Sequence, residues 1–268
     1  MRTHSNNLLL TVLAFVFFFS CSKPKEENAL QAYRSVETAP AEATQAPNDK
    51  KSLPIVLRRV ETFSAELSQY ESHAGRQSLE PLFQKGQSLA AMLVSVIDVF
   101  KEEYYLFAKN NMRGYLINRD KVVYALPDIK FFKNLAAKRG EKADAAFFEL
   151  LGQTRQDNVW PVYVEPSEEM TGCIRYGPGT MVELYEKWMR FKSDYPTAYV
   201  KQRDDNLRSI GLDLATSVCA CGSVDDVLKE FRLFIAKFPN SAITPQLKKR
   251  INDVQQKTDP MRFNCTTG

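Results

Sequence analysis

Residues 188–196 read WMRFKSDYP, and residues 231–239, lying 43 positions further along the chain, read FRLFIAKFP. Both segments place an aromatic residue at their first, fourth and eighth positions and a proline at the ninth. Apolar residues three and four apart share one face of an α-helix, and the proline predicts where that helix ends. A further helix is predicted after each proline, over about 201–218 and 245–256. The repeat therefore predicts two helical hairpins near the C-terminus.

This pattern, which closes with Phe238-Pro239-Asn240-Ser241, resembles the tetratricopeptide-like arrays of bacterial outer-membrane lipoproteins. The resemblance covers residues 180–256. It departs from the family in period, because the offset of 43 residues exceeds the tetratricopeptide repeat. The glycine and alanine signature positions of the first helix are also largely missing. The resemblance implies a stack of helical hairpins whose grooves accept a peptide or helix of another protein.

Helical periodicity also occupies the residues before the repeat. Leu53, Val56, Val60, Phe63, Leu67 and Tyr70 form one apolar stripe and predict a first helix, which residues 72–75 interrupt. A second, longer helix is predicted from Leu79 to about Asn110, packed against the first as an antiparallel hairpin. Residues 115–118 and 122–124 predict a β-hairpin, and residues 128–139 and 141–154 predict two more helices.

We therefore expect a mainly α-helical protein, built as a helical bundle or as helical-hairpin repeats with at most a small β-hairpin. Four regions are predicted: a signal peptide at 1–20, a flexible tether at 21–52, an N-terminal helical region at 53–157 and a disulfide-bonded, tetratricopeptide-like region at 158–268. Residues 21–52 carry few large apolar side chains and could not offset the entropy of ordering.

Cys21 follows a run of twelve residues, Leu8–Phe19, that is apolar apart from Thr11. The run is too short to span a bilayer, and it lies behind a thin basic segment as secretory signals do. Ser20-Cys21-Ser22 resembles the cleavage site of a bacterial lipoprotein, in which lipid, including palmitate, is attached to the cysteine. Phe18 and Phe19 depart from the usual motif, so cleavage into a secreted or soluble periplasmic protein stays an alternative. In such lipoproteins an aspartate directly after the cysteine commonly retains the protein at the inner membrane. Residue 22 is serine instead, so the resemblance implies the periplasmic face of the outer membrane.

Four cysteines remain after the signal: Cys173, Cys219, Cys221 and Cys265. An even number in an oxidising compartment predicts disulfides. Closure between Cys219 and Cys221 would give a strained ring, so we expect one of them to pair with Cys173 and the other with Cys265. The sequence leaves open which takes which. A zinc site or a redox pair is the alternative, although the single C-x-C lacks the usual spacing of either.

Catalytic motifs are missing from the sequence, and we expect no enzyme, cofactor or metal. His73 is the one histidine after the signal and lies in a polar turn. Pairs of adjacent carboxylates occur at 102–103, 168–169, 204–205 and 225–226, but neighbours on a helix point about 100° apart and do not converge on a substrate. The pairs at 204–205 and 225–226 are predicted at helix starts, where negative charge is favoured. The net charge of +4 is spread along the chain and does not indicate nucleic acid binding.

Trp160, Tyr163 and Tyr176 are candidate binding residues, because loops beside a predicted disulfide would expose them. The alternative is that they seal the junction between the two halves of the protein. The preferred function is a membrane-anchored lipoprotein that faces the periplasm and binds a protein or envelope component as a scaffold or accessory. Two alternatives are an immunity or inhibitor protein against a periplasmic toxin or lysozyme, and an enzyme acting on the envelope.

Overall fold

The structure is a computed structural model that describes residues 53–120, 122–167 and 172–265. The predicted signal at 1–20, Cys21 and the tether at 21–52 lie outside the described residues. Within those residues, no helix combines the length and the apolar character that crossing a membrane requires. Pro47–Gly268 forms one compact unit by its internal contacts. The predicted regions 53–157 and 158–268 both contribute to its hydrophobic core.

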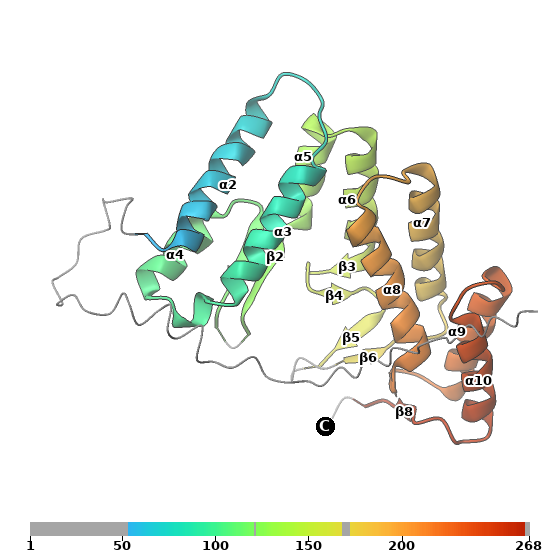
Figure 1. The fold of residues 1–268 in the computed structure, drawn as a ribbon. Coiled ribbons are helices and arrows are strands. Elements are labelled where there is room, and N and C mark those ends of the chain that lie inside the picture. The colour runs from blue at the N-terminus through green and yellow to red at the C-terminus, as the bar shows by residue number, and fades with distance from the viewer. Residues whose placement is uncertain (1–52, 121, 168–171, 266–268) are drawn as a thin grey trace, which may run out of the picture. The chain divides into compact units, whose positions relative to one another are not determined.

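The predicted mainly α-helical fold is confirmed (Figure 1). The helices are α2 (Ile55–Ser72), α3 (Glu80–Val94), α4 (Glu102–Asn111), α5 (Ile129–Arg139), α6 (Lys142–Thr154), α7 (Thr180–Asp194), α8 (Val200–Thr216), α9 (Val224–Lys237), α10 (Thr244–Gln255) and the short 3-10 helix η1 (Ile97–Val99). The strands are β1 (Tyr115–Asn118), β2 (Tyr124–Pro127), β3 (Arg155–Gln156), β4 (Trp160–Pro161), β5 (Val164–Pro166), β6 (Gly172–Ile174), β7 (Cys219–Ala220) and β8 (Arg262–Phe263).

Four helical hairpins follow one another along the chain: α2–α3, α5–α6, α7–α8 and α9–α10. Contacts between α2 and α5, between α6 and α7, and between α7 and α9 join each hairpin to the next (Figure 1). Helices that each bury one apolar face gain stability only when a neighbour covers that face. The hairpins predicted for the first two helices and for the C-terminal repeat are therefore present, and α5–α6 adds a further one.

The repeat that predicted the last two hairpins is visible in the backbone. Tyr195 ends α7 with φ −133° and ψ 68°, and Phe238 ends α9 with φ −127° and ψ 61°. Each donates its N–H to a carbonyl four residues earlier, at 2.9 Å to Phe191 and 2.8 Å to Phe234. The proline that follows disfavours helical backbone at the residue before it. Both predicted helix ends are thus confirmed.

The single long helix predicted over Leu79–Asn110 is wrong. Helix α3 ends at Val94, and η1 and an extended Phe100 separate it from α4. The interruption contains Val96, Ile97 and Val99, β-branched residues that favour helices less than straight-chain residues do. The turn also buries Ile97 and Phe100, and it brings α4 against α2. Tertiary packing here overrides an apolar periodicity that continued through the break.

The β-structure is more extensive than the single hairpin that the sequence predicted. Strands β1 and β2 form that hairpin, with Tyr115 opposite Pro127, so its second strand starts two residues later than predicted. Strands β3 and β4 form a second antiparallel pair. A third sheet has the order β5-β6-β7-β8, in which β6–β7 and β7–β8 are parallel. Parallel pairing joins segments far apart in sequence, so local patterns do not reveal it.

Aromatic rings fill the core between α3, α6 and the start of α8. Phe147 stacks on Tyr199 with ring centroids 3.7 Å apart, and Phe83 meets Phe148 edge-to-face at 5.0 Å. Tyr199 has a left-handed backbone with φ 47°, which is unfavourable for a residue with a side chain. Its ring is fully buried, and this burial offsets the strain. The N-terminal and C-terminal hairpins share this core.

Candidate functional site

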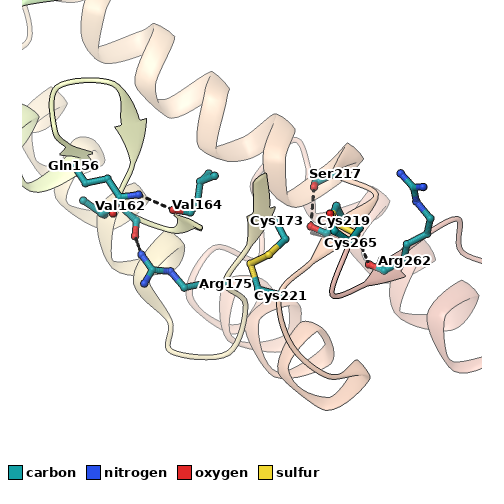
Figure 2. The surroundings of a disulfide bond; sticks show 10 residues. All are labelled: Gln156, Val162, Val164, Cys173, Arg175, Ser217, Cys219, Cys221, Arg262 and Cys265. Atoms are coloured by element: carbon teal, nitrogen blue, oxygen red, sulfur yellow. Dashed lines mark hydrogen bonds between the residues drawn. A yellow bond between two sulfur atoms is a disulfide. The ribbon is translucent and has the colours of Figure 1, made fainter. Parts of the chain in front are cut away.

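Two disulfide bonds fix the β5-β6-β7-β8 sheet, which lies at the C-terminal end of α8 (Figure 2). Cys173 pairs with Cys221, and Cys219 pairs with Cys265, with Cα–Cα distances of 5.0 and 5.9 Å. The predicted division of partners is confirmed, and the structure resolves the open choice between them. All four thiols are committed to these bonds, so none is free to bind a metal. The part of the chain that the structure describes contains no group of three or more side chains suited to holding a metal ion.

The glycine turn before α7 encloses a buried carboxylate. Glu230 on α9 accepts hydrogen bonds from the backbone N–H groups of Gly177 at 3.0 Å, Gly179 at 2.8 Å and Val182 at 3.4 Å. Gly177 and Gly179 have φ of 100° and 85°, a region that suits glycine and turns these N–H groups toward one point. Glu230 therefore occupies the anion-binding position at the N-terminus of α7 and joins the third and fourth hairpins.

The three predicted binding aromatics have different surroundings. Tyr163 and Tyr176 are 2% and 4% exposed, so the expectation that they are exposed is wrong. The Tyr163 hydroxyl donates a 2.7 Å hydrogen bond to Oδ2 of Asp213, and the Tyr176 hydroxyl donates a 3.3 Å bond to the carbonyl of the same residue. They seal the contact between the small sheets and α8. Trp160 is half-buried on β4.

Burial shifts the pKa values at this contact. It raises the pKa of Tyr176 to about 12, although the Arg250 charge opposes the shift. The pKa of Tyr163 is raised further, first by burial and then by the Asp213 carboxylate. Burial also raises the pKa of Asp213, against the hydrogen bond from Tyr163 and the charge of Arg155. Elevated pKa values often mark functional sites, but these three groups lie in the contact between the small sheets and α8 and line neither of the two cavities described below.

The candidate catalytic groups that the structure describes lie on separate helices. His73 is exposed at the end of α2, and Asp225 and Asp226 lie in the first turn of α9, as predicted. The pair at 204–205 lies in the second turn of α8 instead of the first, where both aspartates form ion pairs with Lys or Arg side chains. The pair at 102–103 lies in the first turn of α4. Residues 168–169 lie outside the described residues.

An open groove separates the third hairpin from the loop between α9 and α10. We call it the hairpin groove; its volume is about 380 Å³. It is lined by Tyr185, Met189 and Lys192 of α7, Asp204, Leu207, Arg208, Gly211 and Leu212 of α8, and Ser241, Ala242 and Ile243 of the loop. Met189 and Leu212 are 41% and 52% exposed, so two large apolar side chains face solvent here. Charged side chains of both signs, Lys192 and Asp204, form a 3.3 Å ion pair in the lining.

Comparison with protein-family models, with curated proteins and with solved structures finds no match to this chain. The groove is therefore interpreted from its own residues.

Sequence reasoning missed the hairpin groove, although a signal for it was present. Met189 follows the buried Trp188 and does not belong to the stripe of residues 188, 191 and 195 that identified the helix. Leu212 likewise points away from the buried face that includes Leu207, Ile210 and Leu214. A large apolar residue off the buried stripe is a signal of contact with a partner, provided that several gather on one surface.

Proposed function

We propose that this chain is an exported, lipid-anchored protein whose hairpin groove binds an amphipathic helix of a partner protein. The observation that carries the proposal is the pair of exposed apolar side chains, Met189 and Leu212, on the facing helices of one groove. Apolar grooves between helices accept helices whose anchors recur at three- and four-residue intervals. The groove lining itself repeats at those intervals, at 185, 189 and 192 on α7 and at 204, 207, 208, 211 and 212 on α8.

The charges of the groove favour a helix over a small apolar molecule. Lys192 and Asp204 pair with each other, and Arg208 pairs with Asp205, so the polar rim is neutralised in pairs. A helix with an apolar stripe and polar flanks would cover Met189 and Leu212 while leaving these pairs at the edge. This division into an apolar centre and a polar rim is typical of protein interfaces.

The export part of the proposal rests on Cys21 and on the two disulfides. Disulfides persist in oxidising compartments such as the bacterial periplasm. A lipid on Cys21 would hold the protein at a membrane, because each buried methylene adds about 0.8 kcal/mol of binding free energy. Labelling with a radioactive fatty acid tests this part. We expect labelled wild type and unlabelled Cys21→Ala, and equal labelling of both would refute lipidation.

The groove is tested by replacing Leu212 with the photo-crosslinker benzoylphenylalanine in cells that make the full chain. The matched control is the same replacement at Leu106, which is 43% exposed on α4 and does not line the groove. We expect a discrete crosslinked protein from position 212 and none from position 106. The identified partner, once purified, should bind Leu212→Glu at least tenfold more weakly than wild type and Leu106→Glu within twofold. Equal binding by both variants would refute the groove as the binding surface.

A further inference from the structure

A second cavity lies at the contact between the N-terminal hairpins and α8. We call it the seam cleft; its volume is about 400 Å³, and its lining comes from α3, β1, β2, α5, α6, the β3–β4 hairpin and α8. Cavities of this size hold small organic ligands, and they occur preferentially where separate parts of a fold meet. The seam cleft shares no lining residue with the hairpin groove. A ligand here would therefore be independent of the proposed helix binding.

The lining of the seam cleft combines an apolar part with polar and charged side chains of the β3–β4 hairpin and α8. Phe83 and Phe147 come from the aromatic core, and Leu126 of β2 adds an aliphatic side chain. Ala90 and Ala91 of α3 contribute only methyl groups to the lining. Ala91 is exposed, whereas Ala90 is 4% exposed. The cleft is thus suited to a flat or elongated apolar body, and the small side chains of α3 leave room for it.

One buried polar atom of the lining lacks a partner. The oxygen Oε1 of Gln202 is shielded from solvent and accepts no hydrogen bond; among the described residues this is true of only one other buried side-chain atom, the Tyr105 hydroxyl. Buried acceptors without donors are rare and costly. Gln202 lines the seam cleft, and the last torsion of a glutamine side chain has a broad energy profile, so this oxygen can rotate toward a ligand. The cleft therefore offers an acceptor to a ligand N–H or O–H group.

The lining also contains a cation that no carboxylate neutralises at close range. Arg155 donates one 3.4 Å hydrogen bond, to the carbonyl of Val159, and forms no ion pair in the described chain. The charge of Arg155 acts on Asp213 only at longer range. The one acidic residue of the lining, Asp205, pairs with Lys201 and Arg208 instead. Arg155 is therefore the one charged residue of the described lining without an ion pair.

We propose that the seam cleft binds a small amphipathic anion: an apolar body that carries one anionic group for Arg155 and one N–H or O–H donor for Gln202. Guanidinium groups bind carboxylates and other oxyanions through paired hydrogen bonds. A hydrogen bond is stronger where apolar side chains partly shield it from water.

The fluorescent probe 8-anilinonaphthalene-1-sulfonate has this chemistry, and N-phenyl-1-naphthylamine has the same apolar body and N–H group without the sulfonate. Both are titrated into the purified full chain. We expect Arg155→Met to reduce the affinity for the sulfonate probe at least tenfold and the affinity for the uncharged probe less than twofold. Gln202→Met should reduce the affinity for both probes at least threefold. Ala91→Trp, which places a large side chain at an exposed lining position, should abolish binding of both.

Matched controls are Arg232→Met and Gln255→Met, which change exposed side chains outside both cavities, together with Leu212→Glu in the hairpin groove. All three should bind both probes as wild type does. If Arg155→Met and Ala91→Trp both bind the sulfonate probe as tightly as the wild type does, the proposal is overturned. Amide NMR of the unmutated protein gives a second readout: probe-induced shifts at Ala90, Leu126 and Gln202 support the cleft, and shifts confined to Met189 and Leu212 refute it. Neither result bears on whether the groove binds a helix.

Discussion

The Tyr199 hydroxyl donates a 2.7 Å hydrogen bond to Oδ1 of Asp144, and this contact joins the starts of three helices. The same oxygen accepts the N–H of Leu79 at 3.1 Å, and Oδ2 accepts the N–H of Glu141 at 2.7 Å. Leu79, Glu141 and Tyr199 directly precede α3, α6 and α8. A negative charge is favoured at helix N-termini because the backbone N–H groups there are unpaired. One buried carboxylate thus fixes three hairpins to one another.

Tyr199→Phe removes this hydroxyl and keeps the ring that stacks on Phe147. We expect the free energy of unfolding to fall by about 1–3 kcal/mol, the contribution of a hydrogen bond to a charged group. Urea unfolding measures the change. Tyr195→Phe is the matched control, because the Tyr195 hydroxyl makes no hydrogen bond in the described chain, and it should alter stability by less than about 0.5 kcal/mol. Similar losses in the two variants would mean that the contact with Asp144 adds nothing.

The sequence predicted the hairpins because their signal is local. The aromatic residues of 188–196 and 231–239 lie on one helix face and the prolines end it, so neither prediction depends on distant residues. The break after Val94 could not be found in this way, since the apolar periodicity continues through it and the contact of α4 with α2 is visible only in the fold. The same limit applies to Tyr163 and Tyr176: their position in a loop suggested exposure, and only the fold shows that α8 covers them. The hairpin groove and the seam cleft likewise form where several helices, strands and loops meet, so no local sequence pattern predicts them.

Glu230→Gln should destabilise the protein although it barely changes the shape of the side chain. The carboxylate accepts three backbone N–H bonds, two at Oε2 and one at Oε1, and an amide would have to place its NH2 donors against at least one of these N–H groups. We expect a loss of about 2–3 kcal/mol in the free energy of unfolding, measured in urea. Glu183→Gln, on an exposed side chain in the first turn of α7, is the control and should cost less than about 1 kcal/mol. A loss no greater than that of the control would contradict the role of Glu230 as a buried cap.

The two disulfides should differ in their rate of reduction. Cys173 is 2% exposed and only its partner Cys221 is partly exposed, whereas both Cys219 and Cys265 are partly exposed. Thiol exchange requires access to a sulfur atom, so we expect Cys219–Cys265 to open first. Limited reduction of the native protein, followed by alkylation and mass spectrometry, gives the order, and earlier labelling of Cys173 would contradict it.

Each disulfide should also stabilise the fold. The bridges connect residues 48 and 46 positions apart. Closing a loop of that length in the unfolded chain corresponds to about 4 kcal/mol in the chain-entropy model. We expect the Cys173→Ala/Cys221→Ala and Cys219→Ala/Cys265→Ala double variants each to lose up to this amount in urea unfolding. If both double variants have the wild-type free energy of unfolding, the disulfides do not stabilise the fold.

Arg250 and Asp259 form a buried ion pair whose contribution should depend on pH. Two hydrogen bonds of 3.0 Å join them, and the Arg250 guanidinium also donates to the carbonyls of Leu214 and Ser217 at 2.8 Å. Burial alone would raise the pKa of Asp259, but the bonds and charge of Arg250 outweigh it and lower that pKa below its ordinary value. The stabilisation is then complete above the pKa of the unfolded carboxyl, about 3.9, and is lost as the pH falls through the lower, folded value.

Asp259→Asn should therefore reduce the free energy of unfolding by about 3 kcal/mol at pH 7, since it leaves the buried Arg250 charge without its partner. The deficit relative to wild type should shrink between pH 4 and pH 2, because the wild-type carboxyl becomes neutral there as well. Urea unfolding across this range measures both effects, with Asp225→Asn, on the exposed first turn of α9, as the control. A deficit that stays constant down to pH 2 would mean that the shape of the Asp259 side chain, and not its charge, stabilises the junction of α8 and α10.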